Sequence, residues 1–241
     1  MSEENKVKTS EKPAKTAEQK EKTLEIIVAI FLGVTALLTS WASWVGSLHG
    51  GNQSTNYTVS NNLSAEANSE YNTAMQNYMQ DMMIWNQINE VLLNQQFAEE
   101  SGDDLTAEKA EWRLDQLLAD NVTDSFLDAI NWALEQEEAA SPFEMEGYVE
   151  SYFDTYYDLI EQSDETLEQG KKDNSNGDAF GLVTVIYSVV LFMLGIVGTF
   201  KNLPNRYIVL AFSIAGFLFA TIYMFTLPMP TGFSLSSFFG G

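Results

Sequence analysis

The chain has 241 residues and no cysteine, and 34 Asp and Glu residues outnumber 12 Lys and Arg residues, which gives a formal net charge of -22. The lack of cysteine excludes a disulfide scaffold and a thiolate zinc site. The negative charge argues against nucleic acid as a partner, because proteins that bind phosphate backbones need an excess of basic residues. The chain has a single histidine, His49, so motifs that require two histidines are excluded.

Three charge-free runs of at least 20 residues place the chain among integral membrane proteins, since about 20 apolar residues span a bilayer as a helix. Before the first run, residues 1–22 are rich in Lys and Glu and predict a disordered tail. The run from Ile26 to Leu48 is too long for the apolar core of a signal peptide and predicts a permanent transmembrane helix over residues 24–48.

Small residues recur along this first predicted span at spacings that alternate between four and three residues. Such a stripe favours close helix packing, within the chain or between subunits, and the alternative is that its serines line a pore in an oligomer. The second span adds two glycines to this predicted packing or pore face. The complete set is Ala29, Gly33, Ala36, Ser40, Ser43, Ser47, Gly195 and Gly198.

Residues 49–178 are strongly acidic and predict a helical domain inserted between the first two spans. Residues 49–61 contain Gly50 and Gly51 and predict a flexible exit from the membrane. His49, at the start of this segment, is interpreted as an interfacial histidine without a defined role. From Leu63 to Leu92 the apolar residues fall on one helix face. After a loop at residues 101–104, two shorter helices are expected over residues 106–118 and 123–139.

A last helix of this domain is predicted to start at Ser141-Pro142, which provide an N-cap and a proline at the first helical position, and to run to about Gly170. Aromatic residues cover one half of it and are expected to pack against the face between Leu63 and Leu92. The opposite side carries a stripe of carboxylates. This acidic stripe comprises Glu146, Glu150, Asp154, Asp158, Glu161 and Glu165.

The acidic stripe has two interpretations. It is a solvated helix face, or it concentrates cations or a basic protein near the membrane. Residues 173–178 resemble the start of a calcium loop, but glycine stands at the fifth position instead of the sixth and no glutamate stands at the twelfth, so a specific calcium site is rejected. The sequence predicts no catalytic group, no specific metal site and no cofactor.

The second and third spans are predicted over residues 179–200 and 207–227, joined by a turn at residues 201–206 and followed by a short tail, residues 228–241. Basic residues gather in residues 1–22 and in the turn, so both are expected in the cytoplasm, with residues 49–178 and the C-terminal tail outside. The outer segment then carries four sequons, which predict glycosylation at Asn52, Asn56, Asn62 and Asn121 in a cell that glycosylates exported chains. The alternative for the first three is that a segment rich in Asn, Ser and Thr produces sequons by chance.

Together these features predict an all-α membrane protein with three transmembrane helices and an antiparallel helical extracytoplasmic domain. The chain resembles uncharacterised prokaryotic membrane proteins with one span, an outer helical region and a closing pair of spans. The resemblance rests on the residues of the first span, on the SPFEME segment and on the run DAFGLVTVIYSVVLFMLGIVGTF. It implies a topology and no activity.

The leading hypothesis is a non-enzymatic membrane scaffold or accessory subunit that self-associates and displays its acidic domain. The alternative, of a different class, is a homo-oligomeric channel or cation-handling assembly. A transporter is disfavoured because the three charge-free runs hold no Asp, Glu, Lys, Arg or His, the residues that normally form an ion relay. The expected partners are the lipid bilayer, further copies of the chain, and cations or a basic protein at the acidic domain.

Overall fold

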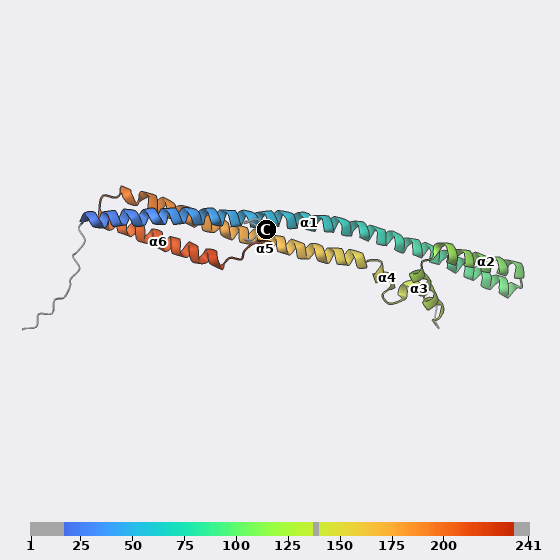
Figure 1. Ribbon diagram of the computed structural model, residues 1–241. Coiled ribbons are helices and arrows are strands. Elements are labelled where there is room, and N and C mark those ends of the chain that lie inside the picture. The colour runs from blue at the N-terminus through green and yellow to red at the C-terminus, as the bar shows by residue number, and fades with distance from the viewer. Residues whose placement is uncertain (1–16, 137–139, 234–241) are drawn as a thin grey trace, which may run out of the picture. The chain divides into compact units, whose positions relative to one another are not determined.

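The computed structural model describes residues 17–136 and 140–233, which form helices and contain no strand (Figure 1). The all-helical prediction is confirmed for this part of the chain. The helices are α1 (Ala17–Ser101), α2 (Asp104–Asn121), α3 (Asp124–Leu134), α4 (Tyr148–Ser151), α5 (Asp154–Ile196) and α6 (Leu203–Thr226), with 3-10 turns at Pro142–Glu144 and Val197–Thr199.

Helices α1, α5 and α6 are each long and apolar enough to cross a membrane, as the three charge-free runs predict. The described residues group into two compact units by their contacts. Unit 1 comprises residues up to Thr55 together with those from Gln169 onward, and unit 2 comprises Asn56–Glu168. Helices α1 and α5 contribute residues to both units.

The prediction of a flexible exit at residues 49–61 is wrong, because α1 continues as one helix through Gly50 and Gly51. Helix α5 likewise continues through residues 173–178, where a break was expected. Each glycine costs about 1 kcal/mol in a helix interior. Extending an existing helix nevertheless adds one hydrogen bond per residue without a new nucleation step, and the residues beside these glycines are packed.

The predicted terminal tails lie mainly outside the described residues, which leave out residues 1–16 and 234–241. Residues 17–22, predicted as the end of a disordered tail, belong to α1. The two shorter helices predicted after the loop are present as α2 and α3. Their N-caps are Asp103 and Thr123, whose side chains accept hydrogen bonds from backbone N–H groups three residues on. Residues 137–139, the predicted end of α3, are not among those described.

Unit 1 is held by apolar side chains from all three candidate spans. One cluster includes Val45 of α1, Phe180 of α5 and Ala220 of α6, each with no exposed area. A second cluster includes Leu24, Leu194 and Leu210, again one from each helix. Between α5 and α6 the Tyr187 hydroxyl and Thr221 Oγ1 form a 2.9 Å hydrogen bond. The three candidate spans therefore pack against one another as a bundle within the chain.

Glycines allow the helices of this bundle to approach closely. A Cβ atom on Gly46 of α1 would lie 3.3 Å from the Phe180 Cβ, and one on Gly177 of α5 would lie 3.5 Å from the Gly46 carbonyl oxygen. A Cβ atom on Gly216 of α6 would lie 3.0 Å from a Val190 methyl. The α1 and α5 backbones are thus in near contact just before His49.

Unit 2 has an aromatic core. The Tyr71 ring of α1 contacts the rings of Phe153 and Tyr156 at centroid distances of 5.4 and 5.3 Å, so the aromatic half of the last predicted helix packs on α1 as expected. Phe126 of α3 has no exposed area and stacks on Tyr148 of α4. Such ring pairs add roughly 0.5–1.5 kcal/mol beyond the area they bury.

The prediction of one continuous helix from Ser141 to Gly170 is wrong. Ser141 caps a 3-10 turn with Pro142 in its first turn, as the motif predicts, but that turn ends at Glu144. Gly147 then adopts a φ of 79°, in the left-handed region, and α4 and α5 follow as separate helices. The chain bends here because the aromatic residues on both sides of Gly147 pack into the unit 2 core.

We predict that Gly177→Val lowers the stability of unit 1 by about 2 kcal/mol, since the added methyl groups overpack the contact with α1. Gly181→Val is the matched control, because it changes the same residue type on the same helix where a Cβ meets nothing within 4 Å. Thermal unfolding in mild detergent measures both. Equal melting temperatures of the two variants would show that the close approach contributes nothing.

Candidate functional site

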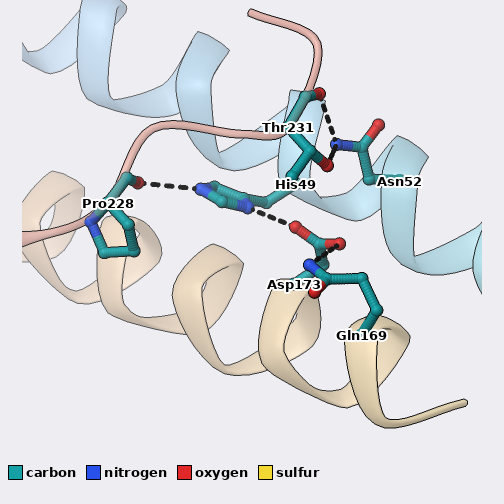
Figure 2. A network of polar contacts seen from close by, with 6 residues as sticks. All are labelled: His49, Asn52, Gln169, Asp173, Pro228 and Thr231. Atoms are coloured by element: carbon teal, nitrogen blue, oxygen red, sulfur yellow. Dashed lines mark hydrogen bonds and ion pairs between the residues drawn. The ribbon is translucent and has the colours of Figure 1, made fainter. Parts of the chain in front are cut away.

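Polar side chains meet at one end of the three candidate spans in unit 1 (Figure 2). His49 comes directly after the first charge-free run on α1, and Asp173 comes six residues before the second run on α5. The chain that follows α6 contributes the Pro228 carbonyl and Thr231. Three segments that are far apart in sequence therefore share one set of hydrogen bonds, which we call the His49 cluster.

His49 is the centre of the cluster. Its Nδ1 lies 2.8 Å from Oδ1 of Asp173, and its Nε2 lies 3.1 Å from the carbonyl oxygen of Pro228. The side chains of His49 and Asp173 are only 1% and 2% exposed. A buried polar pair of this kind is stable only when its hydrogen bonds are formed, because each unpaired group would cost about 1–3 kcal/mol.

The two acceptors around the imidazole fix how many protons the pair holds. A carbonyl oxygen only accepts, so Nε2 of His49 carries a hydrogen and donates to Pro228. The Nδ1 contact with Asp173 then needs a further proton. It belongs either to an imidazolium facing a carboxylate or to a carboxylic acid facing a neutral imidazole, and both arrangements leave the pair with no net charge. The cluster can therefore be buried without an unbalanced charge.

Further contacts extend the cluster on both sides. The Gln169 side chain donates to Oδ2 of Asp173 at 3.2 Å. The Asn52 side chain donates to the backbone carbonyl and to the hydroxyl oxygen of Thr231, at 3.1 and 3.2 Å. As Figure 2 shows, the segment after α6 is thus bound at two points to successive turns of α1.

Packing positions the imidazole for these bonds. The close approach of Gly46 and Gly177 brings α1 and α5 together within one turn of His49, and a Cβ on Gly177 would lie 3.6 Å from the His49 Cβ. The Phe180 ring lies nearly parallel to the imidazole with centroids 5.8 Å apart. Both ring nitrogens of His49 are bonded within the chain, so neither faces a substrate. The arrangement acts as a latch that joins α1 to α5 and to the segment after α6.

The interpretation of His49 as an interfacial residue without a role misses this latch. In the sequence, Asp173 stands out only as the first residue of the rejected calcium loop. The sequence did contain a signal for this contact. Because the first two spans are antiparallel, His49, which follows the first run, and residues 173–178, which precede the second, lie at the same end of the bundle. The sequence did not show which of Asp173, Asn174 and Asp178 turns toward α1.

The predicted packing or pore face on α1 lies on the outside of this chain. Its six residues from Ala29 to Ser47 are all exposed, as are Gly195 on α5 and Gly198 in the 3-10 turn that follows it. At 100° per residue this stripe lies roughly opposite the face of α1 that carries Ala42, Val45 and His49 into the bundle. The hydroxyl of Ser40 donates to the Ala36 carbonyl on its own helix. The intramolecular contacts of α1 therefore use its other face.

The opposite end of the spans holds a second charged contact. Arg206 of α6 is 6% exposed, and its Nη1 lies 2.7 Å from Oε1 of Glu21 near the start of α1. Glu25 lies 3.8 Å from the other terminal nitrogen. The Nε of Arg206 has no hydrogen-bond partner among the described residues. This contact fixes the start of α6 against α1, at the end of the bundle opposite the His49 cluster.

The remaining predicted residues lie on surfaces. All six carboxylates of the acidic stripe are exposed, and the described residues contain no group of three or more potential ligands that could hold a metal ion. Three of the predicted glycosylation sites, Asn52, Asn56 and Asn62, lie within α1 instead of a flexible segment. Asn121 is the last residue of α2.

A comparison with models of known protein families, with curated proteins and with solved structures finds no match to this chain.

We predict that His49→Leu destabilises the bundle by about 3 kcal/mol, because it leaves the buried Asp173 without its partner. Asp173→Leu should cost a similar amount, and the double variant should cost clearly less than the sum. Unfolding in detergent measures all three. Additive losses would mean that the two residues do not act as a pair.

A conservative variant separates the hydrogen bond from the shared proton. Asp173→Asn offers an amide that donates to Nδ1 while Nε2 still donates to Pro228, so it should retain much of the stability that Asp173→Leu loses. If Asp173→Asn were as unstable as Asp173→Leu, the pair would depend on charge and not on the hydrogen bond alone.

Proposed function

We propose that the protein is a non-enzymatic membrane scaffold that self-associates through α1 and displays the acidic helices of unit 2. The observation that carries the proposal is the division of α1 into two faces. One face packs into the bundle through residues such as Ala42 and Val45, while the stripe from Ala29 to Ser47 stays exposed. A bundle that already buries its own core leaves this stripe available for a second copy.

The chemistry of the stripe supports a helix partner. Lipid tails are as apolar as leucine, so helices associate in a bilayer through close packing, which small residues permit by letting two backbones approach. The stripe follows a period of about 3.5 residues, which suits a left-handed pair of helices. Its serine hydroxyls are able to bond to their own backbone, as Ser40 does, so they enter an apolar interface without an unpaired donor.

The proposed orientation places the N-terminus and the turn before α6 in the cytoplasm and unit 2 outside. The lysines of residues 1–22 and Lys201 support it through the bias of basic residues toward the cytoplasm. The contact of Arg206 with Glu21 supports placing the turn and the N-terminal segment on the same side. Cations or a basic protein are then attracted to the outward acidic stripe.

We predict that Ser40→Leu weakens self-association by about 1–3 kcal/mol, because a large side chain separates the two helices. This corresponds to a loss of about fivefold to 160-fold in the association constant. The mass of the protein in mild detergent or nanodiscs, corrected for bound lipid, measures the effect. Ala215→Leu makes the same kind of change at an exposed site on α6 and should leave the mass unchanged.

Two outcomes would overturn the proposal. If the wild-type protein is monomeric at all concentrations tested, it does not self-associate and the scaffold proposal is wrong. A closed ring of three or more copies that conducts cations in liposomes, with a current abolished by Ser40→Leu, would establish the channel instead.

Orientation can be tested directly because the chain contains no cysteine. We predict that Asp164→Cys, on the exposed surface of unit 2, reacts with a membrane-impermeant maleimide in intact cells. Asn202→Cys, in the turn before α6, should react only after lysis. The reverse pattern would invert the topology.

A further inference from the structure

A polar cavity of about 440 Å³ lies within unit 2. Helix α1 forms one wall, and the end of α2, the start of α3, α4 and the start of α5 form the others. Of its thirteen lining residues, twelve have polar side chains, two are carboxylates and none is Lys, Arg or His. Glu70 and Asp81 are the carboxylates, and hydroxyl and amide groups provide nearly all of the remaining surface.

Asp81 is the more deeply buried of the two carboxylates. It is 6% exposed although it carries a carboxylate, and two tyrosines fix its position. The Tyr148 hydroxyl donates to Oδ2 of Asp81 at 3.0 Å, and the Tyr152 hydroxyl donates to the same oxygen at 2.5 Å. Because both bonds end on Oδ2, Oδ1 has no hydrogen-bond donor among the described residues and is available to a ligand.

The two tyrosines hold the carboxylate in place as fixed donors. Burial raises the pKa of both hydroxyls well above the ordinary value for tyrosine, and the neighbouring Asp81 carboxylate adds to the rise. Tyr148 and Tyr152 therefore keep their protons across the physiological range. No basic residue lines the cavity, so the charge of Asp81 has no counter-ion there.

Glu70 lies at the other end of the α1 wall. Eleven residues separate it from Asp81, which is about 16 Å along the helix axis at 1.5 Å per residue. Eleven steps of 100° return to nearly the same direction, so both carboxylates lie on one face of α1. Thr73 and Asn77 lie on that face between them and also line the cavity.

We propose that this cavity binds a linear polyamine, with one ammonium group at Asp81, another toward Glu70 and the chain between them along Thr73 and Asn77. The separation of the carboxylates suits cationic groups joined by methylene chains better than a single metal ion, which needs several ligands at one point. Asparagine and threonine oxygens accept hydrogen bonds from an intermediate amine. The site is independent of self-association through α1.

The experiment titrates spermidine into the full chain held in nanodiscs of phosphatidylcholine, a lipid without net charge, and measures binding by calorimetry. One saturable site per chain is expected. Asp81→Asn and Glu70→Gln should each weaken binding by at least about tenfold, because each removes a charge partner from the cavity. Triethylene glycol, a neutral chain with similar hydrogen-bonding atoms, should not bind.

Glu66→Gln is the matched control, since Glu66 is exposed one turn from Glu70 on α1 and does not line the cavity. It removes the same charge and should leave the affinity unchanged. Equal weakening in all three variants would show diffuse attraction to an acidic protein and would overturn the proposal. So would the absence of a saturable site, or binding of triethylene glycol as tight as that of spermidine. If Asp81→Asn does not fold, Glu70→Gln against Glu66→Gln decides the question.

Discussion

The pairing of His49 with Asp173 is the buried polar contact that joins α1 and α5 at one end of the bundle. The side chains of His49 and Asp173 are almost fully buried, so their polar atoms must find partners within the chain. The imidazole reaches a carboxylate on α5 and a carbonyl beyond α6 at the same time. One side chain therefore connects α1 both to α5 and to the segment that follows α6.

Close helix packing makes that pairing possible. Gly46 and Gly177 allow α1 and α5 to approach just before His49, and the apolar clusters of unit 1 hold α6 against both. Since these contacts use one face of α1, the small residues from Ala29 to Ser47 remain outside the bundle. The same packing that completes the fold of one chain thus leaves a face suited to a second chain, which is the basis of the proposed scaffold function.

Unit 2 buries polar groups among aromatic side chains. An aromatic core of tyrosines and phenylalanines surrounds Asp81, and two phenol hydroxyls replace the water that its carboxylate would otherwise bind. Aromatic residues pack through their rings and still offer a hydrogen-bonding hydroxyl. This combination places a polar cavity that opens to the surface beside the aromatic core, and it gives the acidic unit a chemical feature beyond its exposed stripe.

The sequence by itself determined the helical class, the three apolar spans and the aromatic face that packs on α1, because these follow from periodicity, from charge-free length and from side-chain volume. It did not determine where helices continue or bend: α1 passes through Gly50 and Gly51, while the chain breaks at Gly147, since packing on both sides outweighs local propensity. Only the tertiary structure paired His49 with Asp173 and Asp81 with Tyr148 and Tyr152. Those partners are separated by 124, 67 and 71 residues, and no local pattern encodes which polar side chain turns inward.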